Sequence, residues 1–322
     1  MENTANVAMS PLEELTRDQD FWLQDGSVVL VAEKTAFKVY AGLLSVHSPV
    51  FSGMFSPANH ADETYDGCPV VRMSDSPEDV KWLLTHLIPK TLLHIKSAHV
   101  PEYPELSALA RLGHKYQIDA LEKHATDRLK TVFTNNVEQF ERQLLTASSI
   151  YAGYNPIDII HIGRLTNNPG MLPLAFWLCA QNEDIIIDGQ ARGKDGALMV
   201  LSKADAKRCI AGIYELCQLS ERALQQTRLA VPVQTCATPT ACRAGLEASI
   251  GTGAASGPTQ AQTGAIGKGC RDIYLLKGFR FQGCDACKQA FGNLRRTKRR
   301  ELWKQLPRIF GLQAELKRHW PE

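Results

Sequence analysis

A short apolar run near the N-terminus most constrains what this chain can fold into. The run SVVLV at residues 27–31 is continuous and β-branched, which is typical of a strand that is fully buried. After a turn, residues 35–40 alternate, with Phe37 and Val39 on one face and Lys38 on the other. The two segments together predict a β-hairpin at the centre of a core.

The residues after the hairpin predict two short helices, a loop and a third strand. Residues 43–47 place apolar side chains at helical spacing, and Ser48 followed by Pro49 marks the start of the second helix. Residues 57–67 are polar and predict a loop, and residues 69–73 form another short apolar run. The order of a hairpin, two short helices and a further strand predicts an α+β domain.

The clearest local signal in the chain is the start of a helix at Ser76. Ser76 is a favourable N-cap, Pro77 suits the first helical position, and Glu78 and Asp79 favour the positive end of the helix dipole. An apolar stripe at helical spacing follows, made by Val80, Leu83, Leu84 and Leu87. Two more amphipathic helices are predicted downstream, the first opened by Pro104 and the second running from Ile118 to Val132.

These motifs, in this order, resemble the BTB/POZ domain family over residues 21–133. The run DGSVVLVAEKTAFKVYAGLLSVHSPVFSGMF at 25–55 is similar to the core signature of the family, and SDSPEDVKWLLTHLIP and LSALARLGHKYQIDALEKHA are similar to its later helices. Tyr40 stands where the family usually has His. The matching residues are Asp25, Phe37, Val39, Leu43, Ser48, Pro49, Phe51 and Phe55.

The resemblance implies a small sheet wrapped by helices, and it implies association rather than catalysis. Such domains dimerise, usually through the N-terminal segment and first helix, and recruit other proteins, so we expect a homodimeric interaction scaffold. Some members are adaptors of cullin-type ubiquitin ligases and carry a hydrophobic-x-Glu step before the third strand. Residues 61–63, Ala-Asp-Glu, are an incomplete version of that step.

Outside residues 21–133 the composition divides the chain into four segments. Residues 1–20 are polar and acidic and predict a disordered arm, whereas residues 134–247 predict an all-α extension. Residues 248–269 are rich in Gly, Ala, Ser, Thr and Gln and predict a flexible loop. Residues 270–322 predict a basic, helical tail. The order of a BTB domain and a helical extension also resembles BTB proteins of mushroom-forming fungi.

The net charge is only +2 but is unevenly distributed. Residues 270–322 contain 13 Lys/Arg and 5 Asp/Glu, a net charge of +8, and residues 295–300 read RRTKRR. Such a run is typical of a nuclear-import or nucleic-acid surface, and also of a solvated helix face. No aromatic residue interrupts the run, so it offers no platform for base stacking. Because the basic run is typical of both kinds of surface, nucleic-acid binding stays an alternative to the scaffold function.

Two cysteine pairs flank the predicted loop. Cys284 and Cys287 form a CxxC motif, and Cys236 and Cys242 lie upstream, with Cys270 able to replace one member. Four thiolates can bind one Zn²⁺ tetrahedrally at about 2.3 Å, so the sequence predicts a structural zinc site. Two alternatives remain: four unligated thiols, and a redox CxxC pair, which usually follows a strand of a βαβ unit that this sequence does not supply.

Other function classes find little support. No stretch reaches the roughly 18 apolar residues that a membrane helix needs, and the longest, residues 172–180, falls far short. The N-terminus lacks the apolar run of a secretory signal, and nine cysteines, an odd number, argue against a complete disulfide framework. P-loop, HExxH and GxSxG motifs do not occur. We therefore expect an intracellular protein that is not an enzyme and has no membrane partner.

Overall fold

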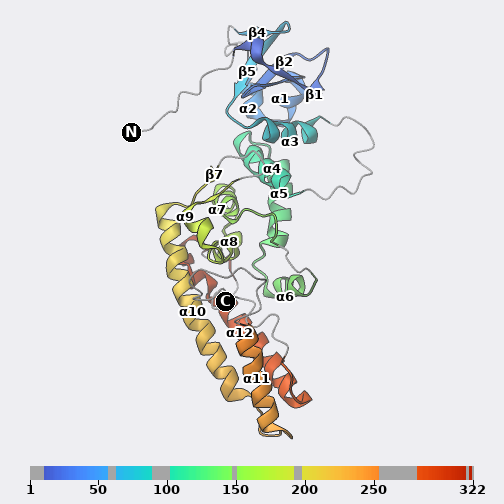
Figure 1. The fold of residues 1–322 in the computed structure, drawn as a ribbon. Helices are drawn as coiled ribbons and strands as arrows, with labels where there is room; N and C mark the ends of the chain where they lie inside the picture. Colours follow the sequence, from blue (N-terminus) through green and yellow to red (C-terminus); the bar gives the residue numbers. More distant parts are fainter. Residues whose placement is uncertain are drawn as a thin grey trace. The chain divides into compact units, whose positions relative to one another are not determined.

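A computed structural model describes residues 11–56, 63–88, 102–146, 151–191, 198–253, 281–316 and 319–320. The chain divides into two compact units, which are described separately. Unit 1 contains the residues up to Thr131, and unit 2 contains most of the chain from Val132 onward (Figure 1).

Unit 1 is built on a five-stranded sheet with the order β1-β3-β2-β5-β4. β2 and β3 form the predicted antiparallel hairpin, which pairs Leu30 with Phe37, and β5 lies parallel to β2 on its other side. The hairpin prediction is therefore confirmed. The strands are β1 (Thr16–Trp22), β2 (Val28–Ala32), β3 (Thr35–Val39), β4 (Thr64–Tyr65) and β5 (Cys68–Met73).

The sheet is buried on both faces, as the continuous apolar run predicts. All five residues of β2 are buried, and successive side chains enter two different apolar clusters. Leu30 and Phe37 belong to the larger cluster, whereas Val29 and Val31 belong to the smaller one. Lys38, on the face opposite Phe37, is also covered: it is 6% exposed, and its Nζ lies 2.9 Å from Asp66 Oδ2.

Five helices complete unit 1 and follow the predicted order. The predicted cap of α3 is present, because Ser76 Oγ accepts a hydrogen bond from the Asp79 N–H at 3.2 Å. All four residues of the predicted α3 stripe are buried. The helices are α1 (Ala41–His47), α2 (Pro49–Met54), α3 (Pro77–Leu87), α4 (Tyr103–Lys115) and α5 (Asp119–Val132).

The N-terminal boundary differs from the prediction of a disordered arm over residues 1–20. A 3-10 turn at Leu12–Glu14 and strand β1 already occupy part of that segment, and residues 1–10 lie outside the described part. β1 joins the sheet through backbone bonds, such as that from the Thr16 N–H to the Lys34 carbonyl at 2.8 Å. Leu15 and Phe21 are the buried residues between positions 11 and 22. The stretch is otherwise mostly polar, so it has no apolar pattern that predicts a strand.

In the described part of unit 2, the regular structure is helical apart from the two-residue strands β6 (Gln190–Ala191) and β7 (Leu198–Met199). The apolar stretch at residues 172–180 forms α8, in which every residue except Leu178 is buried, as expected for a helix that is hydrophobic all round. α10 and α12 pack along one another and against α8 (Figure 1). The helices are α6 (Val137–Thr146), α7 (Pro156–Leu165), α8 (Leu172–Cys179), α9 (Glu183–Ile187), α10 (Lys203–Ala230), α11 (Pro239–Gly253), α12 (Asp285–Ile309) and α13 (Gln313–Leu316).

The predicted flexible loop at residues 248–269 begins later than expected. α11 continues through its first six residues and ends at Gly253. Small residues dominate this stretch, but Ser249 is buried and its hydroxyl donates to the Gly245 carbonyl one turn earlier at 2.7 Å. The rest of the predicted loop lies outside the described residues, and so does Cys270.

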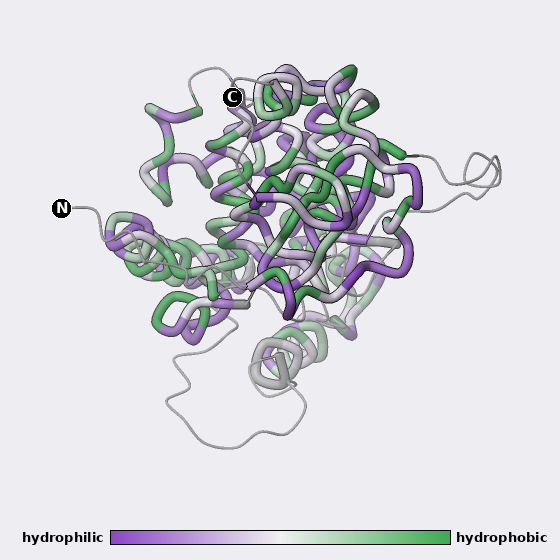
Figure 2. Tube along the Cα trace, turned by 90° about the horizontal axis from the view of Figure 1, so that it is seen from above, coloured by the Kyte–Doolittle hydropathy of each residue, from purple (hydrophilic) through white to green (hydrophobic). Residues whose placement is uncertain are grey.

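Hydrophobic and hydrophilic residues alternate along the helices rather than forming long apolar segments (Figure 2). Within the described residues, no helix is both long enough and apolar enough to cross a membrane.

Truncation of Phe51 tests the core of unit 1. Its side chain is fully buried and stacks on Tyr116 with a centroid distance of 4.4 Å. Phe51→Ala should destabilise unit 1 by about 3–5 kcal/mol, because the ring leaves a cavity in a packed core. Urea unfolding with hydrogen-exchange mass spectrometry reports each unit separately. Lys123→Ala on α5, whose side chain is 77% exposed, is the control, and equal stability of the two variants would contradict the assignment of Phe51 to the core.

Candidate metal centre

The four predicted metal ligands lie at the ends of two helices of unit 2. Cys236 lies in the turn between α10 and α11, where its N–H donates to the Val233 carbonyl at 3.0 Å. Cys242 lies in the first turns of α11, Cys284 is the N-cap of α12, and Cys287 lies in the first turn of α12. The fold thus places two cysteines on each side of residues 254–280, which the structure does not describe.

The four sulfur atoms converge on one point. All of them lie within 4.8 Å of one another, and the Sγ atoms of Cys236 and Cys284 are 3.7 Å apart. Tetrahedral zinc with bonds of about 2.3 Å places its sulfurs about 3.8 Å from each other. No pair exceeds that value by more than about 1 Å, a distance that small side-chain movements can close. The arrangement matches a closed four-cysteine site, with no position left for a substrate.

An apolar shell surrounds the sulfurs. Cys242 and Cys287 are buried, whereas Cys236 and Cys284 are half-buried. The aromatic rings of Phe281 and Phe291 pack together with a centroid distance of 5.4 Å. Such a shell limits the access of water to the cluster and lowers the local dielectric, which strengthens metal–thiolate bonds. The apolar members of the shell are Val231, Val233, Leu246, Phe281 and Phe291.

Hydrogen bonds favour the thiolate of Cys242. Its Sγ accepts from the Cys284 N–H at 3.2 Å and lies 3.5 Å from the Thr238 hydroxyl. These two donors, the Thr238 hydroxyl foremost, lower the pKa of Cys242 to about 6. Burial raises the pKa of Cys287 to about 12 and also raises the pKa of Cys236. Without a cation the cluster therefore favours one thiolate, and a divalent metal ion would supply the charge that stabilises the others.

Close backbone approach fixes α11 against the segment that leads into α12. A Cβ added to Gly245 would lie 2.1 Å from the carbonyl oxygen of Gln282. Only glycine fits there without a backbone shift, so Gly245 sets the separation between Cys242 and Cys284. Sequence reasoning missed both Gly245 and Thr238. Thr238 had a signal, because Thr followed by Pro239 is typical of a helix start.

The basic run at residues 295–300 lies on α12 and is largely engaged within unit 2. Arg300 Nη2 lies 2.9 Å from Glu141 Oε2 on α6, and Arg299 Nη1 lies 3.8 Å from Glu141 Oε1. Lys298 pairs with Glu301 at 2.7 Å. The same face of α12 places Trp303 against Phe140 of α6, with centroids 4.6 Å apart. These contacts favour a packed, ion-paired helix over an open nucleic-acid surface.

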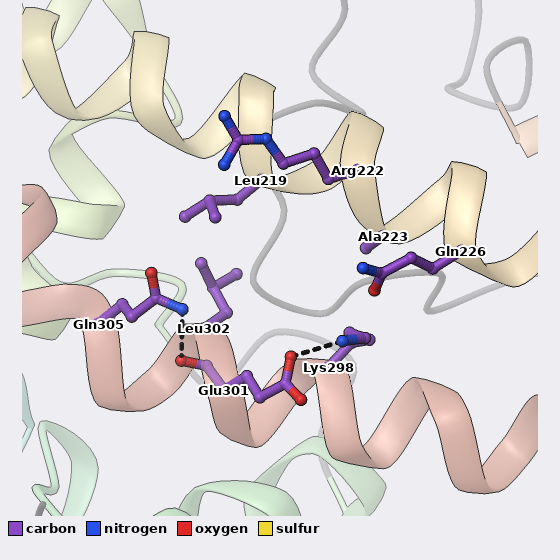
Figure 3. Close-up of a pocket in the computed structure, with 8 residues that line it drawn as sticks. All are labelled: Leu219, Arg222, Ala223, Gln226, Lys298, Glu301, Leu302 and Gln305. Atoms are coloured by element: carbon purple, nitrogen blue, oxygen red, sulfur yellow. Dashed lines mark hydrogen bonds and ion pairs between the residues drawn. The ribbon is translucent and has the colours of Figure 1, made fainter.

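A groove lies between α10 and α12, away from the four clustered cysteines (Figure 3). Leu219 and Leu302 point toward one another across it, and the Lys298–Glu301 ion pair lies at its edge. Its eight lining residues include no cysteine, serine, threonine or histidine. They are Leu219, Arg222, Ala223, Gln226, Lys298, Glu301, Leu302 and Gln305.

The residues of the BTB-like signature hold unit 1 together. Ser48 caps α2 by accepting from the Phe51 N–H at 3.0 Å, and its hydroxyl donates to the Tyr116 carbonyl at 2.6 Å, which joins α2 to the end of α4. Tyr40, which replaces the usual His, donates its hydroxyl to Asp25 Oδ1 at 2.7 Å. The signature therefore has a structural role in this chain.

Glu63 of the cullin-type step is engaged within the domain. Its carboxylate pairs with Arg72 at 2.6 Å. Ala61 and Asp62 lie outside the described residues.

The comparison with known proteins agrees with the fold of unit 1. Residues 22–132 match the family model of the BTB/POZ domain. The match covers the sheet from the end of β1 and all five helices of unit 1, so this chain contains a BTB/POZ domain. Among curated proteins, none matches the chain.

Two glycine substitutions test the close approach beside the sulfurs. Gly245→Ala should destabilise unit 2 by about 1–3 kcal/mol, because the new methyl group overlaps a backbone oxygen. Gly292→Ala on α12 is the matched control: a Cβ there meets nothing within 4 Å, and alanine in a helix should gain roughly 0.5–1 kcal/mol. Denaturant unfolding measures both. Equal changes in the two variants would mean that α11 does not approach Gln282.

Proposed function

We propose that this chain is a non-enzymatic scaffold that associates with itself through its BTB/POZ domain and presents a zinc-stabilised helical unit to partner proteins. The match of residues 22–132 to the BTB/POZ domain carries the first part, because this domain is a protein–protein interaction and dimerisation module. The convergence of four cysteine sulfurs carries the second part.

Unit 1 offers two surfaces for self-association. β1 lies at the edge of the sheet, so one side of its backbone is not paired within the described sheet. Val46 on α1 is 81% exposed, so its apolar side chain is open to an interface. The family resemblance assigns dimerisation to the N-terminal segment and first helix, and these are the same two elements.

Two more specific functions have weaker support. Binding of nucleic acid through residues 295–300 would require Lys298, Arg299 and Arg300 to leave their carboxylate partners. An adaptor of a cullin-type ubiquitin ligase would use the loop before the third strand, where Glu63 is held by Arg72. We therefore propose association with itself and with partner proteins, without assigning either class of partner.

The zinc proposal rests on ligand type and convergence. Four cysteine sulfurs in a closed arrangement suit Zn²⁺, which prefers tetrahedral thiolate sites. The competing redox function of Cys284 and Cys287 is typical of a CxxC pair near a βαβ unit, whereas these two residues lie at the start of a helix in a helical unit and Cys287 is buried. The ion would join α11 to α12 and so stabilise the packing of α12 on α10 and α8.

Self-association is tested on the full chain by analytical ultracentrifugation at micromolar concentration. The wild-type chain should sediment as a dimer, at twice the monomer mass of 35.6 kDa. Val46→Arg should weaken the dimer at least tenfold, because the interface would have to bury a charge. Leu229→Arg, at a residue of unit 2 that is 86% exposed, is the control and should leave the dimer intact. A strictly monomeric wild type would contradict the proposal.

Metal analysis tests the zinc site. The purified chain should hold about one zinc ion, bound by four cysteines. Replacement of Cys284 and Cys287 by serine should abolish binding and raise hydrogen exchange in α11 and α12, with little change in unit 1, because metal binding is coupled to local folding. Cys217→Ser is the matched control, since Cys217 lies on α10 outside the cluster. Equal zinc contents in all three proteins would exclude this site.

A further inference from the structure

The four sulfurs of the cluster are not equally accessible. Cys236 and Cys284 are half-buried, whereas Cys242 and Cys287 are buried. Reagents in solution therefore reach the first two sulfurs before the other two.

The two accessible sulfurs are also close to one another. The Sγ atoms of Cys236 and Cys284 are 3.7 Å apart, close to the ideal tetrahedral value. A disulfide requires about 2.05 Å between the sulfurs, so an approach of less than 2 Å would join them. The two residues are 48 positions apart in the sequence and lie on either side of the undescribed residues 254–280.

We propose that the cluster is a redox-sensitive zinc site in which a hydroperoxide converts Cys236 and Cys284 to a disulfide and releases the metal ion. This inference rests on the proposed zinc binding and adds a mode of regulation to it. The chemistry assigns different tasks to the two sulfur pairs: the accessible pair reacts, and the buried pair maintains the packing around it.

The reaction balances with hydrogen peroxide as the only oxidant. The thiolate of Cys236 or Cys284 attacks one peroxide oxygen, the O–O bond breaks, and hydroxide leaves, which produces a sulfenic acid. The thiolate of the other residue attacks the sulfenic sulfur, the S–O bond breaks, and a second hydroxide leaves. The two sulfurs lose two electrons, the peroxide gains them, and the hydroxides take up protons to become water.

Loss of two thiolates leaves the metal ion with Cys242 and Cys287 alone. Two protein ligands bind a Zn²⁺ ion far more weakly than four, so the ion dissociates. The new disulfide still connects the turn before α11 to the N-cap of α12. Oxidation therefore removes the metal and keeps α12 attached, whereas chelation of the reduced protein removes the metal and leaves no link.

The experiment treats the full zinc-loaded chain with hydrogen peroxide. Zinc release is followed with a chromogenic chelator, and disulfides are mapped by tandem mass spectrometry of the tryptic peptides 229–243 and 281–288, each of which contains two of the four cysteines. We expect release of one zinc per chain together with a link between Cys236 and Cys284, and recovery of zinc binding after a thiol reductant. Cys217→Ser should behave like the wild type.

The possible failures are distinct. A chain that holds no zinc before treatment overturns both the zinc proposal and this inference. A chain that holds zinc but keeps it in peroxide, or that releases it while forming a link through Cys242 or Cys287, overturns the inference alone. Hydrogen exchange gives the second measurement: α12 should stay protected in the oxidised, metal-free chain and lose protection at least tenfold in the reduced chain with a chelator. Equal protection in these two states also overturns the inference.

Discussion

Under the proposed zinc binding, the link between α11 and α12 depends on the meeting of four cysteine sulfurs where these two helices begin. All lie within 4.8 Å of one another inside an apolar shell, and Gly245 brings the backbones of the two segments into contact. Burial of this kind raises the pKa of Cys287 and Cys236, so thiolates form there only with help from a cation. Four thiolates close together repel one another without a cation. A zinc ion bound by all four would make the cluster the strongest local constraint on the folding of the unit.

The constraint at the sulfurs acts on a helix that also makes contacts far from the metal centre. Trp303 of α12 packs against Phe140, and Arg300 pairs with Glu141, so α12 is held along its length by α6 as well as by the cysteines at its start. Unit 1 is stabilised by other interactions. Apolar clusters cover both faces of its sheet, and a hydrogen bond from Ser48 joins α2 to the end of α4. A change at the cysteines should therefore affect unit 2 and spare the BTB/POZ domain.

The sequence predicted most of unit 1 because its signals are local. The continuous run of β2 and the cap at Ser76 act over a few residues, and both are present. β1 was missed because its side chains are mostly polar and its pairing partner lies about twenty residues later in the chain. The start of the loop was predicted too early because α11 is built from small residues, whose helix depends on packing. The candidate ligands followed from cysteine spacing, but Gly245 and the exposure difference between sulfurs require three-dimensional coordinates.

X-ray absorption at the zinc edge tests the central claim most directly, because it reports the ligands of the metal in the intact chain. The account predicts four sulfur neighbours at about 2.3 Å, and a loss of that sulfur shell when Cys284 and Cys287 are replaced by serine. A zinc ion surrounded by nitrogen or oxygen ligands, or a purified chain without zinc, would contradict it. In that case the four cysteines would be packed thiols, and the stability of α12 would rest on its contacts with α6, α8 and α10.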